Sequence, residues 1–121
     1  MTSIHTAILA ALALLAGTLA TTLAASAHSQ SEFTVPADGS TVEAARTLEI
    51  TFDAPMRITV FRLTSDGEEV AVKRETGMEP VTLFRAAPAV PLAPGRYQVE
   101  WRGLSGDGHP MNGAFGFTIA K

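Results

Sequence analysis

His28 holds the first group of atoms that could bind a metal ion. An apolar segment, residues 7–23, is followed by the small residues Ala-Ser-Ala at 25–27. This order is typical of a secretory signal peptide with its cleavage site. Cleavage after Ala27 makes His28 the first residue of the mature protein. Its α-amine and its ring Nδ1 are then two nitrogen donors that can close one chelate ring on a metal.

A second pair of donors lies in the segment Ser-Gly-Asp-Gly-His-Pro at 105–110. Asp107 and His109 are two residues apart, so their side chains point the same way where the backbone is extended. Together with His28 they form a set of three nitrogens and one oxygen, which suits Cu(II) in tetragonal coordination. The alternative is an Asp-Gly turn followed by a loop histidine that bonds to backbone. Spacing alone leaves both interpretations open.

The signal peptide itself has an alternative interpretation. Residues 1–6 contain no Lys or Arg, where positive charge is typical. An uncleaved membrane anchor would need about 17–25 apolar residues, and this Ala- and Thr-rich stretch is weakly hydrophobic for one. We therefore predict a signal peptide at residues 1–27 and one domain at residues 28–121. The mature protein is expected in the periplasm, without stable membrane insertion.

Composition excludes several classes of protein. The chain has 9 Lys and Arg against 12 Asp and Glu, a formal charge of −3, and the signs are mixed along the sequence. Without a basic stripe, a nucleic acid is not expected as a partner. The chain has no cysteine, which excludes zinc-finger, thioredoxin-like and iron–sulfur sites. A small exported domain of this kind must be held by core packing alone, and we expect a monomer.

The mature sequence predicts strands and turns, with no convincing helix. Apolar residues alternate with polar ones, the pattern of half-buried strands, and Gly, Pro and Asp separate these stretches. About seven strands predict an all-β, Ig-like β-sandwich with Greek-key connections, and a small barrel is the alternative. Trp101 is expected to anchor the core. The predicted strands lie near residues 33–35, 48–52, 58–63, 70–72, 81–84, 97–101 and 115–119.

The mature chain resembles the CopC/PcoC/YobA family of periplasmic copper-binding proteins along essentially its whole length. The matching segments are a histidine at the processed terminus and residues 36–40, 92–101, 105–110 and 113–117. The resemblance implies a β-sandwich that binds Cu(II). It also implies the ligands: His28 through its amine and ring, with Asp107 and His109.

The function predicted from these features is a binding protein that buffers or carries periplasmic Cu(II), for copper homeostasis or resistance. It is not expected to be an enzyme, and a copper-transport protein of the inner membrane is the candidate partner. Two alternatives stay open: a copper oxidase or oxygenase with a histidine-brace site, and an Ig-like adhesion domain without metal. A separate Cu(I) site is not expected, because Met56, Met78 and Met111 are isolated and soft thioether sites need several such ligands.

Overall fold

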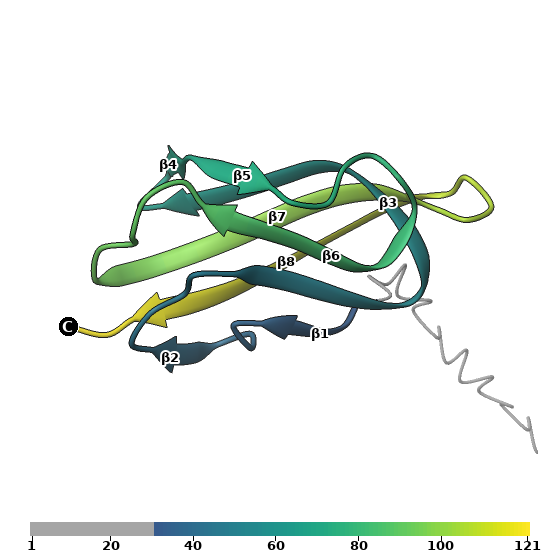
Figure 1. Cartoon of the computed structure of the whole chain (residues 1–121). Coiled ribbons are helices and arrows are strands. Elements are labelled where there is room, and N and C mark those ends of the chain that lie inside the picture. Colours follow the sequence, from purple (N-terminus) through teal and green to yellow (C-terminus); the bar gives the residue numbers. More distant parts are fainter. Residues whose placement is uncertain (1–30) are drawn as a thin grey trace, which may run out of the picture.

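A computed structural model describes residues 31–121, which form eight strands and no helix (Figure 1). The prediction of an all-β protein is confirmed for this part of the chain. Consistent with this, no helix among the described residues is long and apolar enough to cross a membrane. The strands are β1 (Ser31–Val35), β2 (Ser40–Val42), β3 (Leu48–Ser65), β4 (Glu68–Val70), β5 (Val72–Arg74), β6 (Val81–Pro88), β7 (Gly95–Ser105) and β8 (Pro110–Ile119).

The long strand β3 belongs to both layers of the fold. Its first part pairs with β1 and β6, and its second part pairs with β7 and β4. Between the two parts β3 makes a wide bend at the right-hand end of Figure 1, so the chain returns in the opposite layer. The β-sandwich is therefore one continuous, curled sheet with the strand order β2-β8-β7-β3-β6-β5.

The number and bounds of the strands differ from the prediction. The stretches predicted near residues 48–52 and 58–63 are joined in β3, because the bend around Asp53 and Pro55 does not end the strand. The pairing with β6 shifts register across this bend, between Thr51 and Met56, which is where a proline is tolerated in a sheet. The strand predicted near residues 70–72 is two short ones, β4 and β5, and β2 was not predicted.

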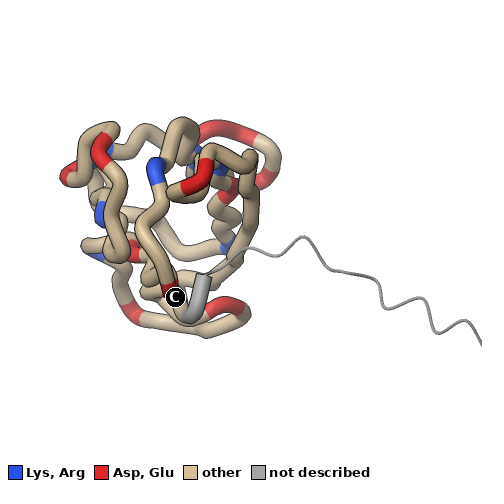
Figure 2. The backbone as a smooth tube through the Cα atoms, turned by 90° about the vertical axis from the view of Figure 1, so that its right-hand side faces the viewer, with Lys and Arg blue, Asp and Glu red and all other residues tan. Residues whose placement is uncertain are grey.

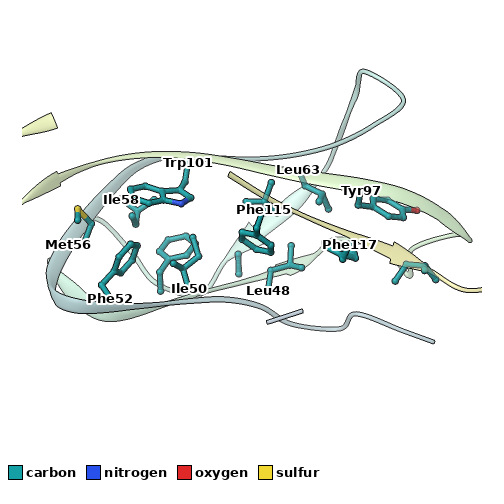
Figure 3. Close-up of a cluster of buried hydrophobic side chains, with 14 residues drawn as sticks. Leu48, Ile50, Phe52, Met56, Ile58, Leu63, Tyr97, Trp101, Phe115 and Phe117 are labelled. Atoms are coloured by element: carbon teal, nitrogen blue, oxygen red, sulfur yellow. The ribbon is translucent and has the colours of Figure 1, made fainter. Parts of the chain in front are cut away.

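The core fills the space between the two layers (Figure 3). Trp101 is 2% exposed, as predicted for the anchor of the core. Its indole meets the ring of Phe52 from the opposite layer edge-to-face, with centroids 5.2 Å apart. No charged or polar residue of the described range is buried, so apolar packing of alternating side chains holds the layers together. The buried residues of this hydrophobic core are Leu48, Ile50, Phe52, Met56, Ile58, Leu63, Phe84, Ala86, Tyr97, Val99, Trp101, Phe115, Phe117 and Ile119.

Gly113 of β8 is pressed against the Trp101 indole. A Cβ at this position would lie 2.7 Å from Nε1 of Trp101, whereas a Cβ at Gly106 would meet nothing within 4 Å. We therefore expect Gly113→Ala to lower the free energy of unfolding by about 1–3 kcal/mol, the usual cost of overpacking. Gly106→Ala is the matched control and should lie within about 0.5 kcal/mol of wild type. Urea unfolding of the metal-free proteins measures both, and equal stabilities would contradict this packing.

Candidate metal centre

The loop between β7 and β8 closes the longest hairpin of the structure. Ser105 and His109 are joined across it by a backbone bond of 2.9 Å, in which the Ser105 N–H donates. Gly108 donates its N–H to the carbonyl of Ser105 at 2.9 Å and has a φ of +84°, a conformation that glycine adopts without strain. The backbone thus holds residues 105–109 in one shape and presents them beyond the ends of the strands.

Asp107 and His109 are in direct contact, although the loop turns between them at Gly108 and is not extended as considered from the sequence. Nδ1 of His109 lies 2.7 Å from Oδ2 of Asp107, and the two side chains are 75% and 65% exposed. An ionised carboxylate only accepts hydrogen bonds, so the imidazole nitrogen donates in this pair. The backbone N–H of His109 also points to the carboxylate, 3.5 Å from Oδ1. The structure therefore brings together two of the three predicted site residues, in an exposed position.

Ser105 contacts both Asp107 and His109, although the sequence did not indicate a role for it in the metal site. Its hydroxyl donates a short hydrogen bond to Oδ1 of Asp107 and accepts the N–H of His109 at 3.1 Å. The bond from Ser105, and then the bond from His109, hold the pKa of the Asp107 carboxyl below its usual value. The signal available in the sequence was the spacing of a serine two residues before an aspartate, which is common in turns and therefore weak.

The separation of the two donor atoms can be compared with the geometry of a metal ion. Two adjacent ligands at right angles, each about 2.0 Å from a divalent ion, are about 2.8 Å apart. The distance between Nδ1 of His109 and Oδ2 of Asp107 is 2.7 Å. This is the length of the hydrogen bond between them, and an ion bound by both atoms would replace the Nδ1 proton with little change in their separation. An imidazole nitrogen with a carboxylate oxygen suits Cu(II).

His28 lies outside the described residues, and so does the predicted signal peptide at residues 1–27. The strand that follows, β1, begins with Ser31 opposite Phe52, just before the bend of β3. Met56, just after that bend, is opposite Ser105 at the start of the β7–β8 loop. Consequently β1 begins at the same end of the sandwich as the loop that carries Asp107 and His109 (Figure 1). Acidic and basic residues are interspersed around this end (Figure 2).

The three methionines of the described range lie in different surroundings. Met56 is completely buried in the core, and Met111 packs against the core from β8. Met78 is 50% exposed in the loop between β5 and β6. Met56 and Met111 therefore contribute to apolar packing.

Comparison with known families and sequences identifies close similarities. The model of the CopC domain matches residues 31–120. Copper resistance protein C of Escherichia coli is 31% identical over 106 residues, covering 78% of this chain and 83% of the relative. Copper resistance protein C of Pseudomonas syringae pv. tomato is 31% identical over 118 residues, covering 86% of this chain and 89% of the relative.

Solved structures agree with the sequence matches. PcoC from Escherichia coli, described as a methionine-rich copper resistance protein, superposes with a TM-score of 0.63 and 31% identity, over 75% of this chain and 97% of PcoC. CopC from Methylosinus trichosporium OB3b superposes with a TM-score of 0.65 and 24% identity, over 77% of this chain and 94% of that protein. The second likeness concerns the fold alone.

Proposed function

Since the chain belongs to the CopC family, we propose that it is a copper-binding protein of the copper-resistance type, which carries or buffers Cu(II) in the periplasm. The observation that carries this proposal is the Asp107–His109 pair, an exposed nitrogen and oxygen donor 2.7 Å apart. The relatives' names supply the metal, and the donor chemistry of the loop suits it. A copper-transport protein of the inner membrane is the proposed partner.

We propose that the remaining donors come from His28, after cleavage of residues 1–27. Its α-amine and ring nitrogen would complete a set of three nitrogens and one oxygen with His109 and Asp107. The position of Ser31 supports this, because β1 begins at the end of the sandwich that bears the β7–β8 loop. Residues 28–30 would then need to span only this end of the domain.

We expect the protein to carry copper without catalysing a reaction, because four protein donors are proposed to bind the ion. Four protein donors would fill the plane of a tetragonal Cu(II) ion, including the position that an oxygen-activating copper keeps open for its substrate. The copper-loaded protein should therefore consume oxygen with ascorbate no faster than the same amount of copper held by a strong chelator. Faster, sustained turnover would favour the oxidase or oxygenase instead.

The proposal is tested by titrating Cu(II) into purified protein that begins at His28. One ion should bind per chain, and electron paramagnetic resonance should show a tetragonal site with hyperfine coupling to nitrogen. An absence of binding at micromolar protein would contradict the proposal, and so would a spectrum without nitrogen coupling. If no copper binds, the chain would be a CopC-type sandwich without a Cu(II) function.

The affinity for Cu(II) should fall as the solution becomes acidic. Because Ser105 and His109 lower the pKa of Asp107, this carboxylate stays ionised in mild acid, and its donation is lost only as the pH falls through that lowered pKa. Imidazole and amine nitrogens bind Cu(II) only when they are deprotonated, so protons compete with the ion for these donors. Competition titrations between about pH 8 and about pH 5 should show steadily weaker binding. Constant affinity over this range would contradict a site with nitrogen donors.

A further inference from the structure

We infer that Ser105 is a positioning residue of the metal centre, which acts on the ion through Asp107 and does not bind it. This inference rests on the proposed function. The hydroxyl of Ser105 donates to Oδ1 of Asp107 and accepts the backbone N–H of His109. One side chain therefore touches both proposed ligands of the loop.

The bond from Ser105 determines which carboxylate oxygen is presented. Oδ1 is engaged by the hydroxyl, while Oδ2 faces Nδ1 of His109 at 2.7 Å. Without the hydroxyl, Oδ1 would keep, within the described range, only the His109 N–H at 3.5 Å, and the carboxylate would be oriented mainly through the contact of Oδ2 with Nδ1, which is lost when Nδ1 binds an ion. Ser105 thus makes Asp107 a one-oxygen donor, with Oδ2 beside the imidazole.

The hairpin does not depend on this hydroxyl for its closure. The backbone bonds between Ser105 and His109, and between Gly108 and Ser105, use main-chain atoms alone and are both 2.9 Å long. Strands β7 and β8 continue their register beyond the loop, from Leu104 opposite Pro110. Removing the hydroxyl should therefore free the Asp107 carboxylate while the loop and the fold remain.

Removing a partner that orients a metal ligand typically weakens metal binding by about 10–100-fold. We therefore expect Ser105→Ala to bind Cu(II) about 10–100-fold more weakly than wild type, in competition with a chelator of known affinity. Ser105→Thr keeps a hydroxyl and should recover most of the loss. The matched control is Ser65→Ala, which removes an exposed hydroxyl bonded to the carbonyl of Arg96 at 2.7 Å, at the C-terminal end of β3. This control should bind Cu(II) like wild type.

The route through Asp107 is tested by a double-mutant cycle. In an Asp107→Ala background, Ser105→Ala should change the affinity for Cu(II) less than about 2-fold, because the carboxylate that it positions is gone. The thermal midpoint of each metal-free variant is measured beside it. A metal-free Ser105→Ala that melts like wild type, with weak copper binding, supports the positioning role. A midpoint that falls in parallel with affinity, and that Ser105→Thr does not restore, would overturn it in favour of a structural role.

The cycle also separates this inference from the proposed function. If wild type binds no Cu(II), or if Asp107→Ala has no effect on binding, the proposed metal site fails. If wild type binds and Asp107→Ala is weakened, but Ser105→Ala binds normally, the site stands and the role of Ser105 is overturned. Additive losses from Ser105→Ala and Asp107→Ala would likewise exclude an action through the carboxylate.

Discussion

Acetylating the α-amine of His28 in the mature protein is expected to weaken Cu(II) binding by more than about 100-fold. This is more than the loss of about 10–100-fold that is typical when a residue that only orients a metal ligand is removed. Acetylation converts the amine into a neutral amide and removes its lone pair as a donor. The ring of His28 would then bind as a single ligand, without the chelate that holds it beside the ion. Chelator competition on acetylated and free protein measures the difference.

Two comparisons make this result specific to the terminus. His28→Ala keeps a free α-amine and loses only the ring, so it should also bind much more weakly. Acetylation in the His28→Ala background should then add less than it does in wild type, because the chelate is already lost. Undiminished binding by acetylated wild type would mean that the amine is not a ligand, and that the proposed cleavage after Ala27 has no role in the site.

Replacing His109 is expected to have the second largest effect. His109→Ala should weaken Cu(II) binding by about 100-fold or more, and Asp107→Ala by less, because imidazole is the better copper ligand and the carboxylate is a weaker oxygen donor. Both side chains are exposed on a hairpin loop, so the free energy of unfolding of the metal-free variants should stay within about 0.5 kcal/mol of wild type.

Thermal unfolding with and without copper checks that these residues are ligands. Wild type should melt at a higher temperature with Cu(II), because a ligand that binds only the folded state stabilises it by mass action. The His109→Ala protein should show little of this increase at the same copper concentration. If its metal-free form instead unfolds well below metal-free wild type, His109 serves the hairpin as scaffold and the assignment as a ligand is wrong.

Much of the fold could be predicted because strand periodicity is a local property of the sequence. Tyr97, Val99 and Trp101 alternate with polar residues, and the structure buries all three in the core. The Asp66-Gly67 pair likewise marks a turn, since both residues adopt positive φ between β3 and β4. The sequence could not predict that β3 continues past Pro55, because this depends on β6 pairing before the bend and β7 after it.

The candidate metal site also combines features that the sequence predicts with features that only the tertiary structure decides. The residue types and the two-residue spacing of Asp107 and His109 predicted a paired carboxylate and imidazole only as one of two open interpretations. The conformation of the loop, with Gly108 at a φ of +84°, decides that the two side chains meet. Only the tertiary structure brings the start of β1 to the end of the sandwich that carries this pair, through the register of both β1 and β7 on β3. The role of Ser105 also needed coordinates, because one hydroxyl can choose among several neighbouring acceptors, and the fold of the hairpin decides that it reaches Oδ1 of Asp107.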